Sequence, residues 1–272
     1  MISGRATHSN PNPPARSRPE IPLLQEMNPP GTLPIGATLV EGWQLFLKSI
    51  TVIILPVWIA GIADELPNLF AGGGLLTGSL GWPVLLITVL TWLVESALFA
   101  SAIAKLDAFA TSTALSYARA LRIGMRAIPA VLIGDLLYNL AAWGGLVLFI
   151  VPGVILGTTL AFFAYAVVLD HKNIFDALGY SHALAWPHWW RTSVVISVPA
   201  IVLFVYDVIA GWADITSAIR QLANGQASSA TALTNPWYDF GLMPLLGGVV
   251  WCYVLSVCYV QYRRLKERAG SY

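Results

Sequence analysis

The chain has 272 residues, of which 57% are hydrophobic and only 11% are charged, and its formal net charge is +1. About a quarter of the residues are charged in an ordinary soluble domain, so this chain lacks the polar surface that a water-soluble globule needs. The small net charge also gives no sign of a nucleic-acid-binding protein, because such proteins carry a marked excess of basic residues. The composition therefore indicates an integral membrane protein.

The first segment, residues 1–33, is rich in Pro, Asn, Ser and Arg. Such a composition cannot bury enough apolar surface to fold, and it lacks the basic start and continuous apolar core of a cleavable signal peptide. We expect a disordered cytoplasmic tail over residues 1–33, a six-helix membrane domain over 34–262 and a basic cytoplasmic tail over 263–272.

Six apolar blocks follow the first segment. A stretch of about 18 or more apolar residues is long enough to cross a bilayer as a helix. The blocks cover approximately residues 50–70, 82–104, 127–150, 154–169, 192–212 and 241–260. They predict an all-α, polytopic membrane protein with six transmembrane helices.

The basic residues support this number of spans and set their direction. Lys and Arg in short loops remain in the cytoplasm, so they should be concentrated in alternate loops. If both termini are cytoplasmic, Arg220 is the one basic residue of 15 that falls outside the cytoplasmic segments. The outer segments contain four acids: Asp64, Glu65, Asp214 and Asp239. We predict a bacterial-type inner-membrane protein with both termini in the cytoplasm.

A related segment precedes each pair of spans, at residues 38–49, 114–127 and 177–191. The second and third share the pattern A-L-x-Y-small-basic-A-L, in which Tyr117 aligns with Tyr180. Membrane folds often contain internal repeats of this kind. We expect three units, each made of a short interfacial helix and a transmembrane hairpin.

The second of these segments has a basic stripe. On a helix, Arg119, Arg122 and Arg126 would share one face, while Leu121 and Met125 would share another. A basic stripe beside an apolar stripe is typical of a helix at the headgroup level of an anionic leaflet. We expect these arginines to contact lipid headgroups. The alternative is a cytoplasmic helix packed on the bundle, with its arginines in water.

Residues 143–191 resemble a known family. They contain an apolar span, a Pro-Gly pair, a second apolar span that ends at Asp170, and an aromatic-rich helix that ends in Trp190-Arg191. This order resembles a broad bacterial family that includes YciC-like inner-membrane proteins and the membrane domain of some glycerophosphodiester phosphodiesterases. The family more often has Glu at the position of Asp170. The resemblance implies a multi-span membrane protein without an agreed activity, and no segment between the spans is long enough for the phosphodiesterase domain itself.

The Pro-Gly pair of this segment, Pro152-Gly153, predicts a turn between the third and fourth spans. Pro presets φ at the second residue of a type II turn, and Gly accepts the positive φ of the third residue. So short a connection would make the two spans antiparallel neighbours. Gly153 and Gly157 also form a G-x-x-x-G pair, which would allow two helices to approach closely.

Three acids lie inside apolar blocks: Glu95 in the second, Asp135 in the third and Asp207 in the fifth. A charge at membrane depth costs about 2.5–3.5 kcal/mol on insertion scales, so such residues are functional candidates. No Lys or Arg lies within the same blocks to pair with them. The acids either carry protons or bind a cation, or they are separate hydrogen-bonded groups that hold helices together.

The sequence indicates no reaction chemistry. It contains no phosphate-binding loop, nucleophile elbow or zinc-protease motif. His171, His182 and His188 lack metal-ligand spacing, and Cys252 and Cys258 are expected to be buried free thiols. We therefore expect no catalytic residue, no metal and no cofactor.

These features favour a non-enzymatic multi-pass inner-membrane protein that acts as a scaffold or as a factor in envelope or lipid homeostasis. The alternative is a transporter or channel for a small molecule, a lipid or a proton that uses the in-span acids. The expected partners are the bilayer and its anionic headgroups, with a membrane-protein partner under the scaffold hypothesis and no nucleic acid. The sequence indicates neither an oligomeric state nor a substrate.

The orientation can be tested by cysteine labelling in a background in which Cys252 and Cys258 are replaced by alanine. Gly73→Cys should react with a membrane-impermeant thiol reagent in intact cells, because an outer loop is accessible. Asn173→Cys should react only after the membrane is opened. The reverse labelling pattern would refute the orientation.

Overall fold

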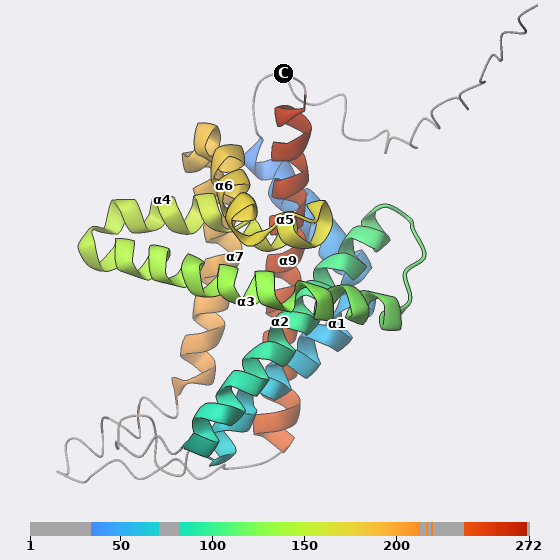
Figure 1. Cartoon of the computed structure of the whole chain (residues 1–272), viewed down its shortest axis with the longest axis vertical. Helices are drawn as coiled ribbons and strands as arrows, with labels where there is room; N and C mark the ends of the chain where they lie inside the picture. Colours follow the sequence, from blue (N-terminus) through green and yellow to red (C-terminus); the bar gives the residue numbers. More distant parts are fainter. Residues whose placement is uncertain (1–33, 71–81, 213–215, 217–218, 220–236, 271–272) are drawn as a thin grey trace, which may run out of the picture. The chain divides into compact units, whose positions relative to one another are not determined.

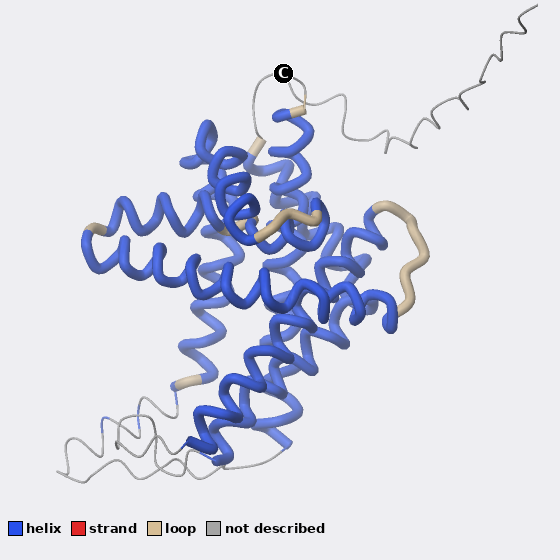
Figure 2. The backbone as a smooth tube through the Cα atoms, in the orientation of Figure 1, coloured by secondary structure: helices blue, strands red, loops and turns tan. Residues whose placement is uncertain are grey.

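The computed structural model describes residues 34–70, 82–212, 216, 219 and 237–270, and these segments consist of helices joined by short connections (Figure 2). The tail expected over residues 1–33 lies outside the described residues. Six helical stretches are long and apolar enough to cross a membrane: Ile35–Pro67, Trp82–Ala110, Tyr117–Leu148, Ile150–Asp170, Ile174–Ala210 and Phe240–Ala269. The all-α, multi-pass class predicted from the sequence is therefore confirmed.

The described elements follow one another as helices with two short irregular pieces. In chain order they are α1 (Ile35–Phe70), α2 (Trp82–Ala110), α3 (Tyr117–Leu148), α4 (Ile150–Leu160), α5 (Phe163–Asp170), α6 (Ile174–Ala185), the 3-10 turn η2 (Trp186–His188), α7 (Trp189–Ala210), the π-helical turn η3 (Tyr238–Leu242) and α9 (Met243–Ala269). Figure 1 shows the hairpin of α3 and α4 running across the direction of α7 and α9.

Two of the three short helices expected before the spans are not separate elements. Residues 38–49 belong to α1 and residues 117–127 belong to α3, and both helices continue into their spans. Pro56 and Pro129 lie inside these helices without ending them, because neighbouring groups can satisfy the backbone that a proline frees in a membrane helix. The third short helix, α6, is separate, since η2 with Pro187 lies between it and α7.

The structure contradicts the turn predicted at Pro152-Gly153. The chain reverses at Phe149, whose extended backbone (φ −158°, ψ 135°) separates α3 from α4. Pro152 and Gly153 lie in the first turn of α4 instead. Proline is well tolerated there, because the first N–H groups of a helix have no intrahelical acceptor to lose.

Gly153 allows α3 and α4 to pack closely. A Cβ atom at Gly153 would lie 2.4 Å from the backbone nitrogen of Leu146, and one at Gly145 would lie 2.8 Å from the Cα of Gly153. At Gly157 the contact is ordinary, since a Cβ atom there would lie 3.8 Å from the Cβ of Ala142. The close approach thus depends on Gly145 and Gly153, and not on the second glycine of the G-x-x-x-G pair.

The fourth span has a break in its interior that the sequence does not predict. α4 ends at Leu160 and α5 begins at Phe163. The buried hydroxyl of Ser181 in α6 accepts a hydrogen bond from the N–H of Phe162 (3.1 Å) and donates one to the carbonyl oxygen of Thr159 (2.7 Å). Backbone groups that leave a helix need such partners in an apolar interior.

Residues 263–269, expected in a C-terminal tail, form the last turns of α9. Three cations of these turns each pair with an acid of a different helix: Arg264 with Glu41 of α1 (2.6 Å), Arg263 with Asp107 of α2 (3.7 Å) and Lys266 with Asp170 of α5. The end of the chain is helical because these acids fix its basic side chains against the other helices.

Two tyrosines of α9 bind the same acids. The Tyr259 hydroxyl donates to Asp107 (2.8 Å), and the Tyr262 hydroxyl donates to Asp170 (2.5 Å). Tyr262 is fully buried and stacks on Tyr165 of α5, with ring centroids 5.6 Å apart. The core therefore continues directly from the ion pairs into the aromatic packing between α5 and α9.

Gly124 and Gly144, both in α3, offer a matched pair of substitutions. A Cβ atom at Gly124 would lie 2.1 Å from the carbonyl oxygen of Ala97 in α2, whereas a Cβ atom at Gly144 would meet nothing within 4 Å. We expect Gly124→Ala to lower the free energy of unfolding by about 1–3 kcal/mol, because the two backbones must separate. Gly144→Ala should be neutral or stabilising by up to about 1 kcal/mol, since alanine favours the helix. Thermal unfolding in detergent measures both changes, and equal melting temperatures would contradict the close contact between α2 and α3.

Candidate functional site

Three acids from α1, α2 and α3 lie near one another, with Glu95 within electrostatic reach of the other two. Glu95 of α2 lies close enough to Asp64 of α1 and to Asp135 of α3 for direct electrostatic interaction with both. The structure thus brings together two acids that the sequence singled out, and it adds a third. We refer to Asp64, Glu95 and Asp135 as the acid cluster.

Asp64 is the member that sequence reasoning missed, because it assigned Asp64 and Glu65 to an outer loop. In the structure α1 continues to Phe70, so both acids lie on the helix. Residues 57–66 contain no proline, so nothing in this stretch prevents the helix from continuing past Asp64 and Glu65.

Asp135 has polar neighbours on its own helix and on α2. The side chains of Trp92 in α2 and Asn139 in α3 lie near its carboxyl group. The Asn139 amide also donates to the backbone carbonyl oxygen of Asp135 (2.9 Å).

No hydrogen bond joins the carboxyl group of Glu95 to another side chain among the described residues. The Ser101 hydroxyl, on the same helix, donates to the carbonyl oxygen of Leu98 (2.7 Å). Glu95 is partly exposed on α2 and has two acids as its charged neighbours. Its position is suited to a proton or a cation that would offset the negative charge.

Asp207, the third acid singled out by the sequence, does not interact with the acid cluster. It is exposed near the end of α7, and its backbone carbonyl oxygen accepts a hydrogen bond from the N–H of Gly211 (2.8 Å). Within the described part of the chain, no three His, Cys, Asp or Glu side chains are arranged to hold a metal ion. The acid cluster is therefore a set of neighbouring charges and not a preformed coordination shell.

The basic stripe lies on the surface of α3. Arg119, Arg122 and Arg126 are exposed, and no carboxylate of the described residues pairs with them. The side chains of Leu121 and Met125 are also exposed, at 39% and 52%. The first turns of α3 thus present basic and apolar side chains to the outside, an arrangement that is typical of helices at the bilayer surface.

Comparison with protein-family models, with curated proteins and with solved structures finds no match to this chain.

Repulsion within the acid cluster can be measured by removing the charge of Asp64. Asp64→Asn should raise the free energy of unfolding on the order of 1 kcal/mol at pH 8, because neighbouring ionised carboxylates repel each other. The effect should diminish at pH 5. Asp207→Asn is the matched control, since Asp207 lies apart from the cluster. Thermal unfolding of both variants at the two pH values makes the comparison, and an equal response of the control would show that the acids do not interact.

Proposed function

We propose that the chain is a multi-pass membrane protein that binds protons or a small inorganic cation at the acid cluster and moves them across the membrane. One observation carries this proposal: Glu95 is within electrostatic reach of two further carboxyl groups and is held by no hydrogen bond from a described side chain. Carboxyl groups take up protons directly, and carboxylate oxygens are the preferred ligands of hard cations.

The acid cluster fits this role better than it fits a purely structural one. Polar groups that hold membrane helices together do so through interhelical hydrogen bonds, which contribute about 0.6 kcal/mol on average. Among the described residues, no hydrogen bond joins the carboxyl group of Glu95 to a side chain of another helix. Neighbouring acids that lack a basic partner among the described residues would weaken the packing of α1, α2 and α3, so their presence favours a function that uses their charge.

The setting that we propose is a bacterial inner membrane with both termini in the cytoplasm. The alternation of basic and acidic segments along the sequence supports this orientation. It places the ion pairs at the end of α9 and the basic stripe of α3 on the cytoplasmic side. The exposed arginines then face the anionic leaflet, and contact with its headgroups remains part of the proposal. No enzymatic activity is proposed.

The second candidate is a scaffold or a factor in envelope or lipid homeostasis, in line with the resemblance of residues 143–191 to YciC-like proteins. One structural feature favours it. The tip of the hairpin of α3 and α4 is apolar and strongly exposed, with Val147 at 85%, Phe149 at 72% and Ile150 at 73%. An apolar surface of this kind is covered by lipid or by a membrane-protein partner.

Reconstitution tests the transport proposal. The purified full chain is incorporated into liposomes that contain a pH-sensitive dye, and proton or cation flux is started by a potassium diffusion potential. Glu95→Gln should reduce the flux to the level of empty liposomes, because glutamine keeps the size and hydrogen-bonding capacity of glutamate but cannot ionise. Asp207→Asn should retain the flux of the unchanged chain.

The folded fraction of each variant, measured by size-exclusion chromatography, separates a loss of flux from a loss of protein. A Glu95→Gln variant that is fully folded and transports as well as the unchanged chain would rule out this function. That result would leave the scaffold as the better candidate.

A further inference from the structure

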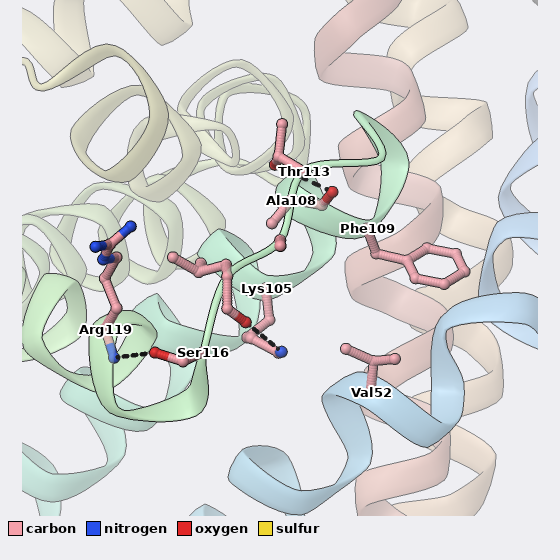
Figure 3. A pocket seen from close by; sticks show the side chains of 9 residues that line it. Val52, Lys105, Ala108, Phe109, Thr113, Ser116 and Arg119 are labelled. Carbon is pink, nitrogen blue, oxygen red and sulfur yellow. Dashed lines mark hydrogen bonds between the residues drawn. The ribbon is translucent and has the colours of Figure 1, made fainter.

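A pocket of about 650 Å³ lies where α1, the end of α2 and the start of α3 meet, away from the acid cluster (Figure 3). Two cationic residues, Lys105 and Arg119, line it together with apolar residues such as Val52 and Phe109. Figure 3 shows Val52 and Phe109 on one side of Lys105 and Arg119 on the other. The pocket thus combines positive charge with apolar surface.

Lys105 is held in place but its charge is not neutralised. Its ammonium group donates to the carbonyl oxygen of Leu115 (2.9 Å) and lies over the ring of Tyr117, 4.1 Å from the centroid. No described carboxylate pairs with it. The nearest acid along α2, Asp107, is already bound by Tyr259 and Arg263 of α9. A partly buried cation without an anion is costly, so it favours an anionic ligand.

Tyr117 fixes the position of this cation. Its hydroxyl donates to the carbonyl oxygen of Val52 in α1 (2.9 Å), which holds the aromatic ring under the Lys105 ammonium group. The same residue therefore joins α3 to α1 and orients Lys105 within the pocket. A preorganised cation loses less conformational entropy when it binds a ligand.

Arg119 provides the second positive charge. Its backbone N–H donates to the hydroxyl of Ser116, which caps the start of α3 (3.3 Å). Arg119 lines the pocket on the side opposite Val52 and Phe109 (Figure 3), and among the described residues no acid pairs with its guanidinium group. A guanidinium group matches the oxygens of a phosphate in a bidentate manner.

We propose that this pocket is a binding site for one phospholipid with an anionic phosphate headgroup. Lys105 and Arg119 contact the phosphate oxygens, and Val52 and Phe109 contact the start of an acyl chain. Basic pockets between transmembrane helices bind headgroups in this way. The proposal differs from general attraction by the basic stripe, since it assigns a discrete site with one occupant. It does not depend on transport by the acid cluster.

A second lysine shows what distinguishes the pocket. Lys172 lies over the ring of Tyr180 (4.3 Å to the centroid), and Tyr180 aligns with Tyr117 in the internal repeat. The contact between lysine and tyrosine is therefore shared by two repeats, and Lys172 is not among the residues that line the pocket beside Lys105. Lys172→Gln is accordingly a control for the loss of such a contact outside the pocket.

Native mass spectrometry of the full chain in a non-ionic detergent tests the site. The protein is titrated with dioleoylphosphatidylglycerol, and we expect one lipid to bind more tightly than the rest. The double variant Lys105→Gln/Arg119→Gln should weaken this binding about tenfold or more. The reason is that the loss of each basic residue near an anionic headgroup lowers the affinity roughly fivefold. Arg122→Gln/Arg126→Gln removes the same charge from the same helix outside the pocket and should weaken it less than about threefold.

Three outcomes would overturn the proposal. Equal losses in the two double variants would mean that the lipid is attracted by the stripe as a whole. A loss for Lys172→Gln as large as that for Lys105→Gln would place the effect in the lysine–tyrosine contact. Inorganic phosphate or glycerol phosphate binding as tightly as the lipid, measured by thermal shift, would identify a soluble phosphate ligand. The single variant Arg119→Gln tests the site without disturbing the fold, because this side chain is exposed and forms no hydrogen bond or ion pair with the described residues.

Discussion

The cations at the end of α9 and the three acids that bind them set the register of the helices around them. The Arg264 guanidinium group donates to Glu41 (2.6 and 3.2 Å) and to Thr38 (3.0 Å), both of α1. Charged hydrogen bonds of this geometry are directional, and a partly buried charge that loses its partner is strongly unfavourable. Because the other two acids belong to α2 and α5, one helix end determines where three other helices stand.

The acid cluster follows from this register. α1 and α2 are each fixed to α9 near one end, through Glu41 and Asp107. Side chains of α1 and α2 that lie at similar distances from these fixed ends therefore come close to one another. Asp64 follows Glu41 in α1 and Glu95 precedes Asp107 in α2, so both acids lie away from the fixed ends, and Glu95 is within electrostatic reach of Asp64. The contact of Gly124 with the backbone of α2 then places α3 close enough for Asp135 to join them. A cluster of like charges, which would separate free helices, is held by attractive pairs elsewhere in the molecule.

The same helices present opposite charges at different places. The acid cluster lies within the spans, whereas the pocket with Lys105 and Arg119 lies where α2 ends and α3 begins. The two proposals accordingly assign a different counterpart to each charge: a proton or cation to the acids, and a lipid phosphate to the cations. A lipid in the pocket would contact α1, α2 and α3, which also carry the acids.

The sequence by itself determined the class of the protein, the number of spans and the exposed arginines of α3. These properties depend on the composition of stretches of about 20 residues, which decides whether a helix prefers lipid or water. Only the tertiary structure decided that Asp64 joins Glu95 and Asp135, that α4 and α5 are separated beside Ser181, and that the chain reverses at Phe149 and not at Pro152-Gly153. The first two depend on contacts between residues far apart in the chain, such as Phe162 with Ser181, and no local pattern specifies which distant residue will lie there. The third depends on the close packing of α3 on α4 at Gly145 and Gly153.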